Sequence, residues 1–193
     1  IDLGPLEPCL PGRLPAGHAA IDAAPDQLVA DLGRLERWAA GNAAGPPGTL
    51  ALIGRRDLRS NNSWMHNHAR LMKGPDRCTL LMHPADAADR GVEDGRRVRV
   101  VSRTGEVEVP VRVTADIARG VVSLPHGWGH GREGVRLRVA SAHPGASLND
   151  LTDDQAVDGL SGNAAFSGVP VTVEPTAEDV SRPRRGLGAL NAS

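Results

Sequence analysis

The sequence is poor in aromatic residues: it has no tyrosine and one phenylalanine, beside three tryptophans. A hydrophobic core therefore has to be built from valine, leucine, alanine and isoleucine. The formal net charge is -1, which gives no bulk attraction to nucleic acid or to an acidic membrane surface. Nucleic-acid binding is therefore disfavoured, and clusters of arginine have to be interpreted locally.

Cysteine is also scarce. The two cysteines, Cys9 and Cys78, lie far apart in the sequence without a C-x-x-C spacing, so neither a metal knuckle nor a disulfide framework is indicated. No apolar stretch reaches the length of a transmembrane helix, and no signal peptide is visible. We therefore expect a cytoplasmic setting.

The motifs of several enzyme classes are missing as well. There is no G-x-S-x-G nucleophile elbow, so the triad that Ser123, His126 and Asp150 could form on paper does not indicate a hydrolase. There is no G-x-G-x-x-G or Walker-type loop, which argues against a Rossmann or nucleoside triphosphate site. We predict no catalytic residue and no metal ligand in this chain.

The length of 193 residues fits one domain with an N-terminal extension. Residues 1–48 are predicted to form an inter-domain linker and a helix that stops at Gly41. Residues 49–175 are predicted to form the folded domain, and residues 176–193 a flexible tail. Because the first residue is Ile1 and not methionine, we expect the chain to be a piece of a longer protein.

Short apolar runs separated by turn residues predict a mainly β fold with short helices. Valine alternates with polar residues over 107–113, as in a strand with one buried face, and Pro110 predicts an edge or a bulge there. Short helices are expected over 63–73 and 85–90, and an extended segment or strand over 136–140. Regularly spaced strands indicate a closed or nearly closed small barrel. The expected strands are residues 49–53, 78–82, 98–101, 107–113, 121–124 and 169–173.

One loop concentrates groups that bind anions and hydrogen-bonding ligands. It has the sequence GRRDLRSNNSWMHN and directly follows the first expected strand. Guanidinium groups match phosphate oxygens, amides donate and accept along the edge of a heterocycle, and Gly54 lets the backbone approach a ligand closely. A solvated surface loop with a chance excess of arginine explains the residue types about as well. The candidate binding residues here are Gly54, Arg55, Arg56, Arg59, Ser60, Asn61, Asn62, Ser63, Trp64 and Asn67.

A second candidate is the segment HGWGH, residues 126–130. Its glycines disfavour a helix, and no acidic or cysteine ligand lies nearby, so the two histidines do not indicate a metal site. We expect a loop at a strand end that lays His126 and Trp128 against a flat heterocycle; a mobile surface loop is the alternative. His66 and His68 are predicted to have surface or capping roles.

Several motifs occur in an order that resembles a known family. They are IGRR-LRSNNSW, then HPADAADRGVEDG, then a run ending in LPHGWGH, and finally SLNDLTDD. This order resembles the C-terminal domain of molybdopterin-dependent oxidoreductases of the dimethyl sulfoxide reductase family, over about residues 49–175. The resemblance implies a six-stranded, closed double-psi β-barrel. It also implies a molybdopterin guanine dinucleotide, which carries molybdenum or tungsten and has a pyrophosphate between a pterin and a guanine.

The resemblance also implies roles for the candidate residues. The three arginines would neutralise the pyrophosphate or lock the loop, and the asparagines and serines would hydrogen-bond to the pterin or guanine. Trp64, His126 and Trp128 would wall the pocket. Asn149 matches an Asn-x-Leu-Thr element whose asparagine approaches the pterin, although a helix cap explains this asparagine equally well.

Part of the site is implied to lie elsewhere. Nothing here matches the family's metal ligand or its iron–sulfur cysteines, so this chain would bind part of a cofactor without completing a redox site. Its partners would be N-terminal catalytic domains of the same polypeptide or complex, of the formate dehydrogenase or nitrate reductase type. The alternative is a separate barrel subunit without catalytic activity, or a protein-interaction module.

Overall fold

The computed structural model describes residues 2, 4–10, 12–15, 20–41 and 46–176. The chain divides into two compact units, Ile1–Ala43 and Ala44–Ser193, and each is described by itself. The first unit contains helix α1, Asp26–Gly41, which ends where the sequence predicts. Within the described residues, no helix is long and apolar enough to cross a membrane. The tail predicted over 176–193 lies, apart from Thr176, outside the described residues.

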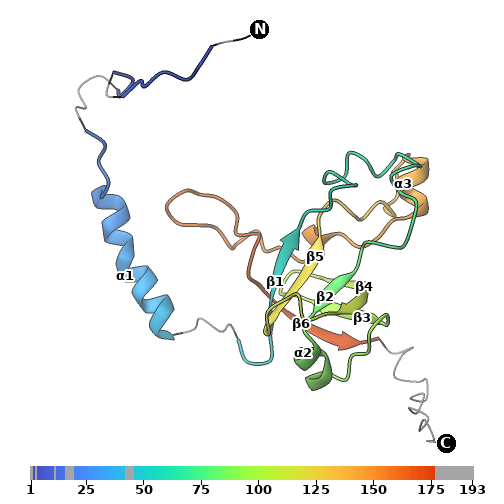
Figure 1. Cartoon of the computed structure of the whole chain (residues 1–193). Coiled ribbons are helices and arrows are strands. Elements are labelled where there is room, and N and C mark those ends of the chain that lie inside the picture. Colours follow the sequence, from blue (N-terminus) through green and yellow to red (C-terminus); the bar gives the residue numbers. More distant parts are fainter. Residues whose placement is uncertain (1, 3, 11, 16–19, 42–45, 177–193) are drawn as a thin grey trace, which may run out of the picture. The chain divides into compact units, whose positions relative to one another are not determined.

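The second unit is built on a closed barrel of six strands in the order β1-β5-β2-β4-β3-β6 (Figure 1). All six strands fall on runs that the sequence predicts. Their bounds are β1 Leu50–Arg55, β2 Leu80–Met82, β3 Arg97–Val101, β4 Glu106–Val113, β5 Val121–Pro125 and β6 Val169–Pro175. Two pairs are parallel, β1 with β5 and β2 with β4, and the other four are antiparallel. Both parallel pairs join strands that do not follow one another in the chain, as in the expected double-psi β-barrel.

Strand β4 shows why these residues form a barrel wall. Val107, Val109 and Val111 are buried in the core, while the residues between them face outward. Val111 donates its N–H to Arg96 on the β3 side, so the nitrogen of Pro110 faces the β2 side. Pairing with β2 begins only at Val111, and the missing N–H of Pro110 therefore costs no ladder bond. The expectation was an edge or a bulge; in the closed barrel β4 is no edge strand, and Pro110 lies just outside its pairing with β2.

The helices of this unit are short. Helix α2, Pro84–Asp89, starts after His83, whose side chain accepts the N–H of Ala85 at 3.1 Å, close to where a helix was expected. Helix α3, Arg138–Ala142, replaces the extended segment expected over 136–140, so that prediction is wrong. A 3-10 turn, η1, covers Leu148–Asp150.

The strand directions bring several loops to one end of the barrel. Because β1 and β5 are parallel, both of their carboxyl ends lie there, and β2, antiparallel to β5, starts there. The turn between β3 and β4 and the start of β6 lie at the same end, because β3 and β6 are antiparallel to their neighbours β4 and β1. Figure 1 shows α2 and α3 near opposite ends, with α3 beside these loops. We call the end of the barrel that carries these loops the loop end.

Asp86 of α2 joins that helix to the start of β5. Its carboxylate is buried, accepts the N–H of Gly120 at 2.7 Å and lies 3.6 Å from Nε of Arg119. We predict that Asp86→Ala lowers the free energy of unfolding by about 2 kcal/mol, because a buried N–H loses its acceptor. Urea denaturation measures this. Asp89→Ala, which removes an exposed carboxylate paired with the same arginine, should change it by less than about 0.5 kcal/mol, and equal losses would contradict the assignment.

Candidate functional site

Arg55, the last residue of β1, ties three strands together at the loop end. Its guanidinium donates to the carbonyl oxygens of Ser123 in β5, at 2.5 Å, and of Thr79 before β2, at 2.6 Å. Burial lowers the pKa of Arg55, which nonetheless keeps its charge at neutral pH. The fork points at backbone carbonyls, so Arg55 locks the root of the loop, which is the second of the two roles that the resemblance implied.

The loop after Arg55 is a series of turns, and the helix predicted over 63–73 is wrong. The carbonyl of Asp57 accepts the N–H groups of Ser60 and Asn61, both at 3.2 Å. Asn61 and Asn62 then adopt left-handed backbone, with φ of 44° and 60°. Asparagine tolerates this region better than most residues, but it interrupts a right-handed helix.

An open groove of about 900 Å³ runs along this loop. The guanidinium of Arg56 donates to the side-chain oxygen of Asn62, which leaves the amide N–H₂ as the donor end of that pair. Arg59 donates to the carbonyl oxygens of Lys73 and Arg70 and so closes the loop on itself. Four of the predicted binding residues therefore share one groove. Its lining is Arg56, Asp57, Leu58, Arg59, Asn61, Asn62, Met65 and Leu71.

Two of the predicted binding residues make hydrogen bonds within the protein. Ser60 is fully buried, and its hydroxyl donates to the carbonyl of Asp57 at 3.1 Å. The side-chain oxygen of Asn67 accepts the N–H groups of Val139 and Ala140, at 3.0 and 3.4 Å, in the first turn of α3. The loop thus caps a helix 72 residues later in the chain, a contact that no local pattern reveals.

Three further predicted residues are exposed at the loop end. Ser63 and Trp64 do not line the groove, and the side chain of Trp64 is 82% exposed. Asn149 is exposed within η1. That turn rests on the β3–β4 connection, where a Cβ on Gly105 would lie 2.6 Å from the carbonyl oxygen of Asp150.

Gly54 makes room for a side chain of the protein itself. A Cβ at this position would lie 2.0 Å from Nε2 of His126, so the imidazole covers the backbone that was expected to meet a ligand. The N–H of His126 donates to the carbonyl of Arg55 at 3.0 Å. Burial, and then the charge of Arg56, lower the pKa of His126, which is therefore neutral at pH 7.

The HGWGH segment touches the groove loop through backbone. Gly127 has a φ of 85°, and a Cβ there would lie 2.3 Å from the carbonyl group of Asn62. Any other residue would push the two segments apart. The two stretches that the sequence singled out are therefore brought together.

A buried stack of rings joins the same two segments. His66 is fully buried, its ring centroid lies 4.3 Å from that of Trp128, and its Nδ1 lies 2.7 Å from Nε2 of His130. Burial, followed by the proximity of His130 and Arg77, lowers the pKa of His66 to about 4. The prediction of a surface or capping role for His66 is wrong. Its partners lie more than sixty residues away, so the sequence gives no signal of them.

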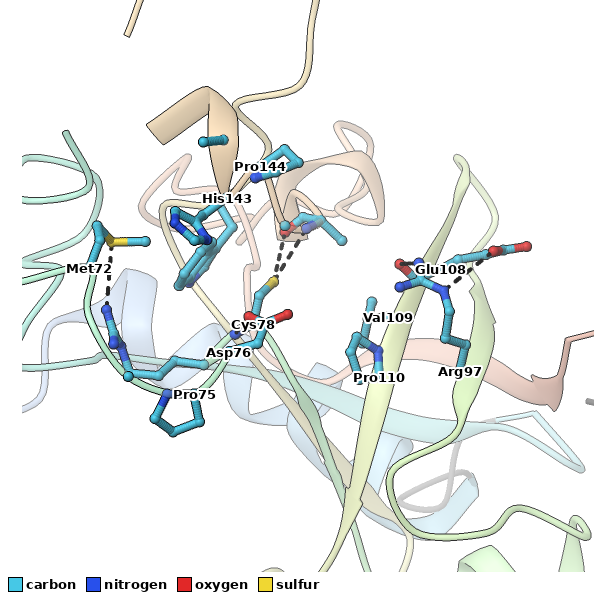
Figure 2. Close-up of a pocket in the computed structure, with 16 residues that line it drawn as sticks. Met72, Pro75, Asp76, Cys78, Arg97, Glu108, Val109, Pro110, His143 and Pro144 are labelled. Carbon is cyan, nitrogen blue, oxygen red and sulfur yellow. Dashed lines mark hydrogen bonds and ion pairs between the residues drawn. The ribbon is translucent and has the colours of Figure 1, made fainter. Parts of the chain in front are cut away.

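Trp128 also borders a cavity of about 490 Å³ beside the loop end (Figure 2). The tryptophan is buried, and its indole N–H has no partner among the described residues. Next to it, Sγ of Cys78 accepts the N–H of Ala146 at 3.3 Å, and burial raises the pKa of this thiol to about 11. Cys78 is a neutral thiol at pH 7. Sequence reasoning missed this cavity, because its walls come from five separate segments.

Comparison with known proteins assigns the family. A profile described as "Molydopterin dinucleotide binding domain" matches residues 50–170, from the start of β1 into β6. The chain belongs to this family. The resemblance seen in the sequence is thereby confirmed, together with the cofactor class that it implied.

The matched proteins are much longer than this chain. It is 27% identical over 127 residues to the arsenate respiratory reductase molybdopterin-containing subunit ArrA of Chrysiogenes arsenatis, covering 62% of this chain and 15% of the relative. It is 43% identical over 46 residues to the F420-dependent formate dehydrogenase subunit alpha of Methanocaldococcus jannaschii, which covers 24% of this chain and 7% of the relative. The solved structure of acetylene hydratase from Pelobacter acetylenicus shares the fold, with a TM-score of 0.57 and 18% identity. The match covers 76% of this chain and 20% of that structure. The chain thus spans about a fifth or less of each.

The residues at the loop end fit a molybdopterin dinucleotide. Arg56 and Arg59 provide cations for phosphate oxygens, and the two left-handed asparagines provide amide groups for ring edges. The unpartnered, buried N–H of Trp128 is the kind of donor that a bound acceptor satisfies. Within the described residues, no group of three or more histidine, cysteine or acidic side chains could hold a metal directly.

We predict that Arg55→Met lowers the free energy of unfolding by about 2 to 3 kcal/mol, because the carbonyl groups of Ser123 and Thr79 lose a charged donor. Urea denaturation of the purified chain measures it. Arg99→Met is the matched control, because the ion pairs of Arg99 with Glu106 and Glu174 are exposed on the outer face of β3. If the two variants lower the free energy of unfolding by equally small amounts, Arg55 does not lock the strands.

His66 predicts a pH dependence of stability. Its pKa is lowered from 6.5 to about 4 in the folded chain, so the unfolded chain binds the proton first as the pH falls. The free energy of unfolding should therefore fall between pH 6.5 and 4, and more in the wild type than in His66→Phe, which cannot titrate there. Urea denaturation at several pH values gives the free energy of unfolding as a function of pH for both proteins. If it falls equally in both, His66 is not held neutral by its surroundings.

Proposed function

We propose that this chain is the cofactor-binding domain of a molybdopterin oxidoreductase and holds a molybdopterin guanine dinucleotide at the loop end of the barrel. The family match over residues 50–170 carries this proposal. The groove supports it, because arginine and asparagine side chains converge there on a rigid barrel end. Binding sites on such folds lie in loops that the barrel positions.

The side chains of this domain would bind and orient the cofactor. Arg56 and Arg59 offset the charge of the phosphates, while Asn61 and Asn62 pair with polar ring edges. Neutral His126 covers Gly54 and adds a flat wall without another charge. The cofactor supplies the redox-active metal, and the protein's share is to position it and exclude water from it.

We further propose that the whole protein is of the formate dehydrogenase or nitrate reductase type. The local identity with an F420-dependent formate dehydrogenase subunit supports this, together with the order of the motifs. The metal ligand and the iron–sulfur cysteines would then belong to N-terminal catalytic domains, which are the expected partners. The cytoplasmic setting stays a prediction.

The groove is tested in the parent protein by Arg56→Ala combined with Asn62→Ala. We predict that the content of guanine nucleotide released on denaturation, and of molybdenum or tungsten by elemental analysis, falls severalfold, because a charged and an amide contact to the cofactor are lost. The barrel should stay folded by circular dichroism.

Arg99→Ala on the outer face of β3 is the control and should leave the cofactor content unchanged. A double variant that retains full nucleotide and metal would remove this groove from the binding site. A wild-type parent without either would contradict the proposed function itself.

A further inference from the structure

A segment that takes no part in the groove projects from the barrel between η1 and β6. Residues 155–168 form a short hairpin, which Figure 1 shows as an orange loop that extends away from the strands. An antiparallel bridge and a hydrogen bond from the N–H of Ala165 to the carbonyl of Ala156, at 2.7 Å, hold its two sides together. At its turn, the carboxylate of Asp158 accepts the N–H and the hydroxyl of Ser161, at 2.9 and 2.6 Å. We call this preformed hairpin the arm.

The arm carries apolar side chains on its exposed surface. Val157, Leu160 and Phe166 are 49%, 47% and 56% exposed, and Phe166 is the single phenylalanine of the chain. Asp158 is the one charged residue of the arm, and its carboxylate already accepts two hydrogen bonds within the turn. A lone exposed apolar residue is ordinary, but three on one short hairpin form the kind of patch that marks an interaction surface.

A cavity of about 540 Å³ lies at the base of the arm. Its two charged lining residues, Arg103 and Asp153, are hydrogen-bonded to each other, so the cavity carries no net charge. Its apolar wall includes Val101, Leu151, Val169 and Pro170 of the barrel side, and Ala156 and Ala165 of the arm. The arm and this cavity therefore form one continuous, uncharged surface, which we call the arm surface.

The outer face of β3, β4 and β6 has the opposite chemistry. There, Arg99 forms ion pairs with Glu106 at 2.9 Å and with Glu174 at 3.4 Å, and all three side chains are exposed. Covering such a face with protein would remove water from several charges at once, which is costly. This face is therefore suited to solvent, whereas the arm surface is suited to contact with another protein surface.

The position of the arm indicates which protein surface that is. The arm leaves from η1, which rests on the β3–β4 connection, and returns to the start of β6, and both of these lie at the loop end. Under the proposed function the groove at this end holds part of a cofactor, so another domain has to approach it there. The chain covers 15% of the arsenate reductase subunit that it matches. A domain of the same polypeptide is present at a high effective concentration, an advantage that a second copy of the chain lacks.

We propose that the arm surface is the docking site for another domain of the parent polypeptide, one that presents apolar side chains to Phe166 and to the cavity. This inference rests on the proposed function and adds the surface through which the barrel is joined to the rest of the subunit. Phe166 is the main anchor, because aromatic side chains bury a large area at little entropic cost. The hairpin is hydrogen-bonded before docking, which lowers the cost of association further.

Photo-cross-linking in the purified parent protein identifies what covers the arm. Phe166 is replaced by p-benzoylphenylalanine, which forms covalent bonds with neighbouring C–H groups under near-ultraviolet light, and mass spectrometry identifies the linked peptides. We expect links to peptides of the same polypeptide outside residues 1–193. The same photo-reactive residue in place of Arg99, on the charged outer face of β3, is the matched control and should give severalfold fewer such links, because that face stays in water.

Phe166→Asp tests the apolar character of the contact. In the parent protein it should speed proteolysis between the barrel and the rest of the polypeptide severalfold, because a carboxylate would be buried among apolar side chains. In the 193-residue chain alone it should leave the midpoint of urea denaturation unchanged, since the side chain is exposed there. Phe166→Leu keeps an apolar side chain and should resist proteolysis as the wild type does.

Three outcomes would overturn the inference: links from position 166 no more abundant than those from position 99, links only to a second copy or to a separate polypeptide, or equal proteolysis of Phe166→Asp and Phe166→Leu. Its failure is separable from that of the proposed function. A parent protein that carries guanine nucleotide and metal, yet gives any of these results, would keep its cofactor-binding domain and lose only the assigned docking surface.

Discussion

The arrangement of the loop end depends on the guanidinium of Arg55. One side chain at the end of β1 donates to carbonyl oxygens of β5 and of the segment that enters β2. The groove loop leaves from β1 and returns to β2, while the HGWGH segment leaves from β5. Arg55 therefore fixes the roots of both loops at once. An arginine with a planar fork can do this, whereas a lysine with a single point charge could not reach the two carbonyls in the same geometry.

Once their roots are fixed, the two loops meet without intervening side chains. Gly127 lies against the backbone of Asn62, and the rings of Trp128 and His130 pack against His66. Loops that are packed in this way lose little conformational freedom when a ligand binds, which lowers the entropic cost of association. The left-handed asparagines are held in place by the same packing, because isolated residues would seldom adopt that backbone.

The sequence predicts those parts of the fold that depend on local pattern. All six strands and the short helix α2 follow from apolar runs, valine alternation, proline and turn residues. It fails where distant contacts override local preference. Residues 63–73 are bounded by residues typical of helix ends, which is why a helix was predicted there. In the structure Asn67 accepts hydrogen bonds from α3 and His66 packs against Trp128, and neither partner is near in sequence. For the site, residue types identified the groove, but they could not distinguish Arg55, which faces the barrel, from Arg56, which faces the groove.

The barrel itself does not determine the reaction. Proteins with this fold include one named as a hydratase, beside relatives named as an arsenate reductase and a formate dehydrogenase. The family match covers the barrel, and in this chain arginine and asparagine side chains line one groove at its loop end. Under the function proposed above, this groove binds and orients the dinucleotide. A fold that occurs in proteins named for different reactions cannot by itself set the reaction, so the contribution proposed for this domain is binding and orientation of the cofactor.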